Sequence, residues 1–318
     1  MPADQKKEVL AVAKLAPFLS DALSRHYTVH DRLHTTDPAA FAAIASRIEV
    51  IVGSGESKVG ADLIERLPAL RLISVMGVGY DGVDVAAAKA RGAVVTHTPG
   101  VLDDDVADLA VALMLAVARQ IASADRYVRA GRWPGGPLPL GRKVSGARLG
   151  IVGMGRIGQA IAHRATAFDM EIGYTARSAK PELPYRYCPT PVALASESDF
   201  LVLITPGGAG THKLIGAEVL AALGSTGYLI NVARGSVVDQ AALIEALDKG
   251  TIAGAGLDVF ENEPDVPQAL RDRDNVVLTP HIGSATSDTR RAMAELAFAN
   301  VQAFFDGRAL LSPVPECR

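Results

Sequence analysis

Three ionisable side chains of different kinds each follow a short apolar segment in the C-terminal half of the chain: Arg234, Glu263 and His281. The apolar segments that precede them are Tyr228 to Ile230, the run that starts at Ala255, and Val276 to Leu278. If these segments are parallel strands of one sheet, their carboxyl ends open into one crevice. A guanidinium, a carboxylate and an imidazole would then lie close together.

This set of side chains suits the reduction of a 2-keto acid. Arg234 can bind the carboxylate and the carbonyl oxygen of the substrate through its planar guanidinium. His281 can bind the same oxygen and protonate it, because imidazole titrates near neutral pH. Glu263 can hydrogen-bond the imidazole, orient it and favour its protonated form. Each residue alone has a structural explanation, as a surface ion pair, a turn cap or a structural histidine, and their joint placement favours catalysis.

A glycine-rich turn between an apolar segment and a helical pattern indicates a dinucleotide site. Gly153, Gly155 and Gly158 follow the segment Leu149 to Val152 and open a helical pattern that continues to Ala167. The first glycine permits a tight turn, the second lets the backbone approach a pyrophosphate, and the third lets helix and strand pack closely. A tight turn without a ligand is the structural alternative. The expected cofactor contacts are Gly153, Met154, Gly155, Arg156, Ile157 and Gly158.

The residues after the next apolar segment, Glu171 to Tyr174, indicate which nicotinamide cofactor is bound. An NAD site usually has Asp or Glu there to hold the ribose hydroxyls. This chain has Thr175, and Arg177, Ser178 and Lys180 follow. Two cations and a hydroxyl suit a 2′-phosphate, so we expect a preference for NADPH, with NADH possible and a solvated basic turn as the alternative. The expected contacts are Thr175, Ala176, Arg177 and Ser178.

The elements that must position these residues alternate along the chain as in an α/β protein. Short apolar runs without alternation predict parallel strands covered on both faces, and amphipathic stretches lie between them. The expected strands are Val9 to Ala13, Val50 to Val52, Leu72 to Met76, Val94 to Thr96, Leu149 to Val152, Glu171 to Tyr174, Phe200 to Ile204, Tyr228 to Asn231, Ala255 to Val259 and Val276 to Leu278. The expected helices include Ala61 to Leu67, Ile157 to Ala167 and Gln240 to Lys249.

One helical pattern is unusually long. The aspartates from Asp103 to Asp105 provide a cap and favourable charge at its start, and apolar residues follow at helical spacing from Val106 to Val117. We expect this helix to run to about Ala130, where Gly131 ends it. The loop after it contains the single tryptophan, Trp133. We interpret Trp133 either as a local packing anchor or as part of an arm that packs on another subunit or on a substrate pocket.

Composition limits the class of protein. Of 318 residues, 49% are hydrophobic and 21% are charged, which is ordinary for a globular protein, and the length suggests two domains. A net charge of −3 without a basic patch argues against nucleic acid as a partner. Cys188 and Cys317 form neither a disulfide framework nor a zinc pattern, and we expect no metal. With no secretory signal and no apolar run of membrane-spanning length, we expect a cytoplasmic protein without a membrane anchor.

Four motifs together resemble those of the D-isomer-specific 2-hydroxyacid dehydrogenases. They are the glycine turn, Asn231 to Gly235, Leu257 to Pro264 and Thr279 to Ser284, in the order and at the spacing of that family. The resemblance covers nearly the whole chain. It implies the catalytic roles given above for Arg234, Glu263 and His281. It also selects Glu263 rather than Glu261, because the motif places the carboxylate just before a proline.

The resemblance implies further contacts with substrate and cofactor. The loop of Gly77, Val78 and Gly79 is similar to the family's loop whose backbone N–H groups bind the substrate carboxylate, and glycine permits such close approach. Asp258 aligns with the residue that contacts the nicotinamide carboxamide, and a turn-forming aspartate is the alternative. The remaining implied cofactor contacts are Thr205, Pro206, Thr211, Val232, Ala233, His281 and Gly283.

The resemblance also implies the architecture, which is two doubly wound parallel-sheet domains. Residues 1–98 and 287–318 would form a discontinuous, flavodoxin-like substrate domain. Residues 99–286 would form a Rossmann domain that binds the cofactor. The family usually forms dimers through its cofactor domains, so we expect a homodimer.

Within the family, the basic turn is similar to that of the NADPH-using glyoxylate and hydroxypyruvate reductases. We therefore expect reduction of glyoxylate, hydroxypyruvate or a similar small 2-keto acid to the D-2-hydroxy acid by hydride transfer from NADPH. The alternative enzyme is an NAD-dependent dehydrogenase of another, larger 2-hydroxy acid. A third hypothesis is a catalytically silent corepressor that senses NAD(H), and the joint presence of Arg234, Glu263 and His281 argues against it.

Overall fold

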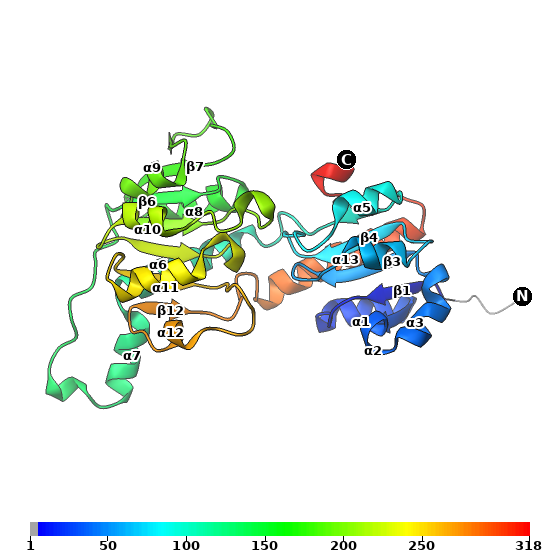
Figure 1. Cartoon of the computed structure of the whole chain (residues 1–318), viewed down its shortest axis with the longest axis horizontal. Helices are drawn as coiled ribbons and strands as arrows, with labels where there is room; N and C mark the ends of the chain where they lie inside the picture. The colour runs from blue at the N-terminus through cyan, green and yellow to red at the C-terminus, as the bar shows by residue number, and fades with distance from the viewer. Residues whose placement is uncertain (1–5) are drawn as a thin grey trace, which may run out of the picture. The chain divides into compact units, whose positions relative to one another are not determined.

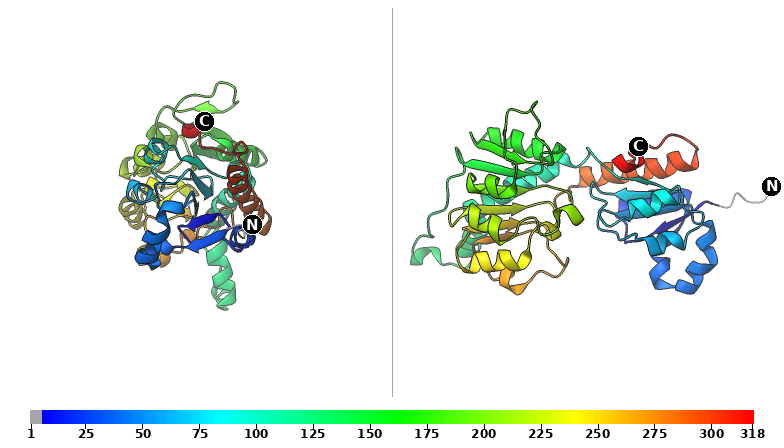
Figure 2. Two further views of the ribbon diagram at one scale, coloured as in Figure 1. Left: turned by 90° about the vertical axis from the view of Figure 1, so that its right-hand side faces the viewer. Right: turned by 45° about the horizontal axis from the view of Figure 1, so that its top comes forward.

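The chain folds into two α/β units in the computed structural model, which describes residues 6–318 (Figure 1). Residues up to Leu102 and the segment Ser284–Arg318 belong to the first unit, and Asp103–Gly283 form the second. Each unit contains one sheet of parallel strands, and helices flank both sheets (Figure 2). The predicted fold class, α/β with two doubly wound parallel sheets, is therefore confirmed.

The first unit is built on a five-stranded sheet with the order β2-β1-β3-β4-β5, which is the flavodoxin-like order. Nearly every residue of β3 and β4 is buried, as expected for parallel strands covered on both faces. The last long helix, α13, returns from the C-terminal segment and packs against α1 and β4. The strands are β1 (Glu8–Ala11), β2 (Thr28–Asp31), β3 (Val50–Ser54), β4 (Leu72–Met76) and β5 (Val94–Thr96). The helices are α1 (Pro17–His26), α2 (Leu33–Thr36), α3 (Pro38–Ile44), η1 (Ala45–Arg47), α4 (Ala61–Glu65), α5 (Val85–Ala90), α13 (Ser287–Phe305) and η5 (Pro315–Cys317).

The second unit is built on a seven-stranded sheet with the order β12-β11-β10-β9-β6-β7-β8. This is the dinucleotide-binding order with one more strand at the β12 edge. Starting from β6, the chain adds β7 and β8 on one side of that strand and then β9 to β12 on the other. The strands are β6 (Arg148–Val152), β7 (Glu171–Thr175), β8 (Arg186–Tyr187), β9 (Phe200–Leu203), β10 (Tyr228–Asn231), β11 (Gly254–Leu257) and β12 (Val276–Leu278). The helices are α6 (Asp103–Ala118), α7 (Ile121–Arg129), η2 (Trp133–Gly135), α8 (Arg156–Thr166), α9 (Pro191–Ser196), η3 (Ala209–Thr211), α10 (Ala217–Leu223), η4 (Gly235–Val237), α11 (Gln240–Asp248) and α12 (Gln268–Arg271).

Every expected strand is present, with small shifts at some ends, and two strands were not expected. Both unexpected strands, β2 and β8, lie at a sheet edge, where a strand pairs on one side only. No residue of β2 is fully buried, and β8 has two residues. An edge strand of this kind has no apolar run from which a sequence pattern could identify it.

The expected helix from Asp103 to Ala130 is wrong in one respect, because it is broken into α6 and α7 with a bend of 59°. Gln120, between them, has a left-handed backbone φ of 54°. The carbonyl oxygen of Ala118 accepts the N–H of Arg142 at 2.8 Å. That oxygen is therefore bound to a residue that returns from the loop after η2, which ends α6.

Within residues 6–318, no single helix is both long and apolar enough to cross a membrane. Together, α6 and α7 have such a length and composition, but only across their bend.

Candidate active site

The glycine turn lies where β6 ends and α8 begins, between the neighbouring strands β7 and β9. Gly153 has a backbone φ of 106°, and a Cβ there would lie 2.8 Å from the carbonyl oxygen of Ile204. A Cβ at Gly158 would overlap the carbonyl oxygen of Gly153. Gly155 precedes α8, and no heavy atom lies within 4 Å of the position its Cβ would take. The turn therefore combines close packing with an open backbone face, which is what a pyrophosphate needs at a helix N-terminus.

The basic turn after β7 presents its polar side chains outward. Thr175 ends β7 and is buried, whereas Arg177 and Ser178 are exposed and Lys180 is half-buried. No acidic residue lies between Thr175 and Lys180. The turn therefore has the charge and the exposure that binding of a phosphate would require.

Two tyrosine side chains, on β7 and β8, bind this turn. The hydroxyl of Tyr174 accepts the N–H of Lys180 at 2.7 Å. The hydroxyl of Tyr187, on β8, donates to the carbonyl oxygen of Ala176 at 3.4 Å. The centres of the two rings lie 5.5 Å apart. Both ends of the turn are thus anchored to neighbouring strands.

The loop that carries Arg234 is held by a buried amide. Asn231, the last residue of β10, is 1% exposed. Its Nδ2 donates to the carbonyl oxygen of Arg234 at 3.0 Å, and its Oδ1 accepts the N–H of Ala233 at 3.0 Å. The guanidinium donates through Nη1 to the carbonyl oxygen of Ala233 at 2.8 Å. The backbone of Arg234 is therefore positioned by a side chain and not by the loop alone.

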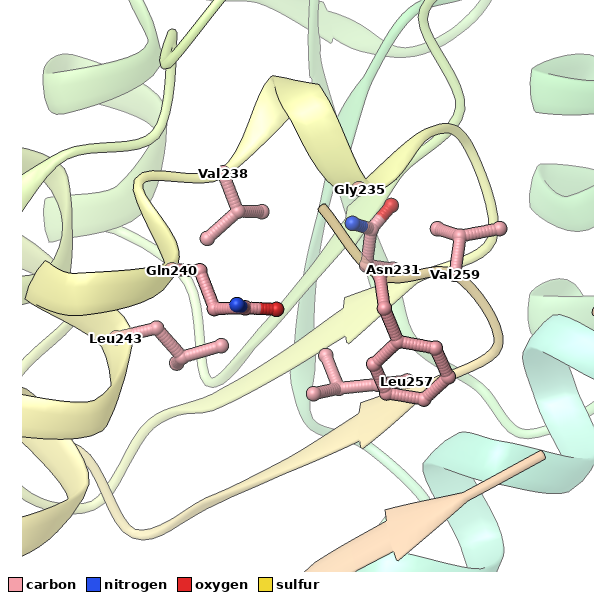
Figure 3. A pocket seen from close by; sticks show the side chains of 8 residues that line it. Asn231, Gly235, Val238, Gln240, Leu243, Leu257 and Val259 are labelled. Carbon is pink, nitrogen blue, oxygen red and sulfur yellow. The ribbon is translucent and has the colours of Figure 1, made fainter. Parts of the chain in front are cut away.

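A small pocket, mostly apolar, adjoins this loop (Figure 3). Gly235 lies so close to Phe260 that a Cβ on it would overlap the carbonyl group of that residue. Gln240, at the start of α11, accepts the N–H of Glu261 at 3.4 Å. The loop after β10 therefore contacts the loop after β11, which carries Glu263. The pocket is lined by Asn231, Gly235, Val238, Gln240, Leu243, Leu257, Val259 and Phe260.

Glu263 and His281 form a hydrogen-bonded pair. Nδ1 of His281 lies 2.7 Å from Oε2 of Glu263, and Oε1 of Glu263 accepts the N–H of Phe260 at 2.9 Å. Burial opposes ionisation of Glu263, but the hydrogen bonds from His281 and Phe260 and the charges of His281 and Arg234 outweigh it and lower its pKa. Because the carboxylate is ionised and can only accept, Nδ1 carries the proton, and the second ring nitrogen, Nε2, faces away from Glu263.

The loop that carries His281 depends on the buried carboxylate of Asp258. His281 has a backbone φ of 52°, which is unfavourable for a residue with a side chain. Asp258 accepts hydrogen bonds from Thr279 Oγ1 at 2.6 Å, from the N–H of Ile282 at 2.8 Å and from the N–H of Gly283 at 2.9 Å. Burial raises the pKa of Asp258, and these hydrogen bonds oppose that rise. Asp258 thus positions the His281 loop, in agreement with the turn-forming aspartate given as the alternative, and its contact with the cofactor stays a prediction.

The other expected cofactor contacts follow strands of the same sheet. Thr205 and Pro206 lie after β9, and Thr211 Oγ1 donates to the carbonyl oxygen of Pro206 at 2.7 Å. Val232 and Ala233 are buried directly after β10. Because the strands are parallel, all these loops lie at the edge of the sheet that also holds the glycine turn and the Glu263–His281 pair.

The expected carboxylate-binding loop, Gly77 to Gly79, belongs to the first unit, where it follows β4. Thr98 donates its N–H to the carbonyl oxygen of Gly77 at 2.8 Å. The structure therefore brings Arg234, Glu263 and His281 together within the second unit and holds the loop from Gly77 within the first.

Sequence reasoning missed the side chains that hold the reactive groups in place. Asn231 ends a predicted strand and begins a motif, so its position carried a usable signal. Tyr174 and Tyr187 carried none, because tyrosines near strands are more often part of the core. The role of Tyr187 depends on the pairing of β8 with β7, which a pattern of two residues cannot predict.

Comparison with known proteins gives similar sequences over almost the full length. Residues 111–283 match a family model described as D-isomer specific 2-hydroxyacid dehydrogenase, NAD binding domain. The hydroxyphenylpyruvate reductase of Plectranthus scutellarioides is 46% identical over 309 residues, which cover 96% of this chain and 98% of the relative. The glyoxylate/hydroxypyruvate reductase A of Arabidopsis thaliana is 44% identical over 308 residues, which cover 96% and 98%.

A solved structure is similar over both units. It is the NADPH-dependent glyoxylate/hydroxypyruvate reductase of Sinorhizobium meliloti in complex with NADP and malonate. The sequence identity is 44%, the TM-score is 0.93, and the match covers 98% of each chain. The likeness therefore includes the folds of both units as well as the motifs.

Two alanine substitutions in the glycine turn separate its packing role from its ligand role. Gly158→Ala places a Cβ against backbone, which cannot yield easily, and should lower the free energy of unfolding by about 1–3 kcal/mol. Gly155→Ala meets open space and should leave stability unchanged, but should weaken dinucleotide binding about tenfold or more, because its Cβ would occupy the pyrophosphate face. Thermal unfolding and fluorescence titration with cofactor measure the two effects. Equal losses of stability in both variants would contradict this division.

Proposed function

Since this chain belongs to the D-isomer specific 2-hydroxyacid dehydrogenase family, we propose that it reduces a small 2-keto acid with NADPH. The family makes it an NAD(P)-dependent oxidoreductase, and the proposed substrates are of the glyoxylate/hydroxypyruvate class, with the D-2-hydroxy acid as product. The observation that carries the chemistry is the 2.7 Å hydrogen bond between Nδ1 of His281 and Glu263. Arg234 is close enough for its charge to lower the pKa of that glutamate.

In the proposed reaction, Arg234 binds the carboxylate and the carbonyl oxygen of the keto acid. When held at the glycine turn from Gly153 to Gly158, the reduced nicotinamide cofactor would provide the hydride that the carbonyl carbon receives. As the new C–H bond forms, the electron pair of the C=O π bond moves to the oxygen, and His281 gives that oxygen the proton from Nε2. Glu263 stabilises the imidazolium before the transfer and keeps the ring oriented afterwards. Solvent then restores the proton on Nε2.

The proposed preference for NADPH rests on the exposed cation Arg177 and on Ser178 beside it. The turn has no carboxylate that would bind the ribose hydroxyls of NAD, and the anchoring by Tyr174 and Tyr187 holds it in one conformation. The Sinorhizobium meliloti reductase, 44% identical to this chain, is NADPH-dependent. We also propose that Asp258 and Gly283 lie near the nicotinamide carboxamide.

A larger substrate is a second candidate, because one relative at 46% identity is a hydroxyphenylpyruvate reductase. The proposed catalytic groups act on the carboxylate and the carbonyl, which both classes of 2-keto acid share. Relative rates with hydroxypyruvate and with phenylpyruvate therefore distinguish the two candidates.

We further propose that the chain acts as a homodimer that uses α7 and the segment after it. No residue of α7 is buried, and its apolar residues Ile121 and Val128 are seven positions apart, on one face of the helix. Trp133 and Leu140 follow and are also exposed. Of the seven large hydrophobic residues exposed in the described part of the chain, four lie in these twenty positions. Such a concentration is typical of an interface between subunits.

We place the enzyme in the cytoplasm. Its two cysteines are free thiols, one of them buried. Free thiols agree with a reducing compartment. Fractionation of cells that produce the protein would test this location.

A steady-state assay tests the proposed reaction. Glyoxylate and hydroxypyruvate should be reduced with NADPH, and faster than phenylpyruvate if the substrate is small. His281→Asn should lower kcat by about 100- to 10,000-fold while cofactor still binds, because it removes the proton donor. His163→Asn, which changes an exposed histidine of α8, is the control and should keep full activity. No turnover of any of the three acids would favour the regulatory hypothesis, and an active His281→Asn variant would disprove the acid assignment.

The same assay over a pH range tests Glu263. Its lowered pKa means that it is ionised throughout the neutral range, so it favours the protonated imidazole there. Glu263→Gln removes that charge but keeps a hydrogen-bond acceptor. The upper pH limit of keto acid reduction should then fall by about one pH unit.

The cofactor proposal predicts an asymmetric effect of Arg177→Ala. The variant should raise the KM for NADPH about tenfold, because a charge-assisted hydrogen bond to the 2′-phosphate is lost, and should leave the KM for NADH nearly unchanged. Arg271→Ala removes an exposed cation from α12 and serves as the control for net charge. Equal changes for both cofactors would refute the 2′-phosphate interpretation.

The dimer proposal predicts a change of mass on substitution in α7. Sedimentation equilibrium should give a dimer for the native chain and a monomer for Ile121→Lys, because a buried lysine opposes association. Leu311→Lys changes an equally exposed apolar residue of the first unit and should leave the dimer intact. A native monomer, or a dimer that survives Ile121→Lys, contradicts the proposed interface.

A further inference from the structure

One buried histidine in the first unit lies beside the loop from Gly77 to Gly79. His97 follows β5, and this loop follows the neighbouring strand β4, so both leave the same edge of the sheet. His97 is 8% exposed, and its ring meets the ring of Tyr80 edge to face at 5.3 Å. None of the roles proposed so far uses this residue.

The side chain of His97 binds the loop through a carbonyl group. Its Nδ1 lies 3.0 Å from the carbonyl oxygen of Val78. Because a carbonyl oxygen only accepts, Nδ1 carries the proton and donates it. The preceding carbonyl, that of Gly77, accepts the N–H of Thr98 at 2.8 Å. Two successive carbonyls of the loop are therefore turned toward the segment after β5.

The planarity of the peptide bond then decides where the N–H groups of the loop point. In a trans peptide the N–H and the C=O of one unit point in opposite directions. The N–H of Val78 shares a peptide with the Gly77 carbonyl, and the N–H of Gly79 shares one with the Val78 carbonyl. Both N–H groups must therefore point away from His97 and Thr98. Adjacent N–H groups directed to one side are an arrangement that binds anions.

His97 is itself fixed by the C-terminal segment. Its backbone N–H donates to the carbonyl oxygen of Ser312 at 3.1 Å, and its own carbonyl accepts the hydroxyl of Ser312 at 2.6 Å. On the other side of the loop, a Cβ on Gly77 would lie 2.9 Å from Cα of Gly55. The loop is thus held between Gly55 and a histidine that cannot move freely.

We propose that His97 is a positioning residue for the substrate: by holding the carbonyl of Val78, it directs the N–H of Gly79 toward the carboxylate of the 2-keto acid. The inference rests on the proposed function and adds to it a residue that touches neither substrate nor cofactor. Thr98 acts on Gly77 through its backbone, so the side chain of His97 is the part of this support that a substitution can remove.

Two variants separate the hydrogen bond from the packing of the ring. His97→Phe keeps a ring against Tyr80 but has no donor. His97→Asn has no ring but carries an amide N–H donor near the position of Nδ1. His97→Phe should raise the KM for hydroxypyruvate about tenfold with kcat within about twofold of the native value, because the lost binding is shared by ground state and transition state. His97→Asn should restore a nearly native KM, and the KM for NADPH should not change in either variant.

Binding of malonate in the presence of NADPH, measured by calorimetry, gives a second readout that needs no turnover. Its affinity should fall about tenfold in His97→Phe and recover in His97→Asn. If both variants lose affinity alike, or if only His97→Asn does, the ring matters and the inference is wrong. A native protein that binds malonate but reduces no keto acid would refute the proposed function. The malonate affinities of the His97 variants would still test the positioning role of His97 in that case. If His97→Phe does not fold, as judged by thermal unfolding, His97→Leu supplies the same comparison without a donor.

Discussion

In the seven-stranded sheet the paired strands run parallel, so their carboxyl ends all lie on the same side of the sheet. The loops that leave from that side follow β6, β7, β9, β10, β11 and β12. The strand order reverses at β6, which separates the loops on its two sides and leaves room for a ligand there. The glycine turn, the basic turn and the loops of Arg234, Glu263 and His281 are consequences of this one arrangement. If one of these strands were antiparallel, the residue that follows it would lie at the amino ends of its neighbours, on the opposite side of the sheet.

Parallel pairing brings loops together, but it does not fix the side chains that they carry. Hydrogen-bonded polar side chains do that here, and two of them, Asn231 and Asp258, are buried. Asn231 holds the backbone of Arg234, Asp258 holds three groups of the His281 loop, and Glu263 is bound both to the imidazole and to the backbone of Phe260. Asn231 and Asp258 would be costly to bury without their partners, so the hydrogen bonds that satisfy them also restrict their loops. The groups that would meet the substrate are thus positioned before it arrives.

The fold was largely predictable from the sequence, because a buried parallel strand such as β9 is a continuous apolar run that a local pattern identifies. The positions of the glycine turn and of Arg234, Glu263 and His281 were predictable because each follows a strand of this sheet, and the catalytic roles of the three side chains stay predictions. What failed depends on distant parts of the chain. The break after Ala118 arises because Arg142 binds its carbonyl, and β8 exists only through its pairing with β7. The supporting roles of Tyr187 and His97 were missed for the same reason, since their partners Ala176 and Val78 lie on neighbouring parts of the fold and not in a local pattern.

The return of α13 to the first unit has a consequence for synthesis. Ser74 of β4 donates to the carbonyl oxygen of Ala297, and Val314 is fully buried in the core beneath the same sheet. The ribosome makes β1 to β5 first, yet their sheet lacks one covering layer until residues 284–318 have emerged. The second unit, by contrast, is continuous in the chain and has all its strands by Gly283. The part of the protein that is translated first is therefore the part that completes its core last, and the nascent chain must carry an uncovered sheet while the dinucleotide-binding unit is made.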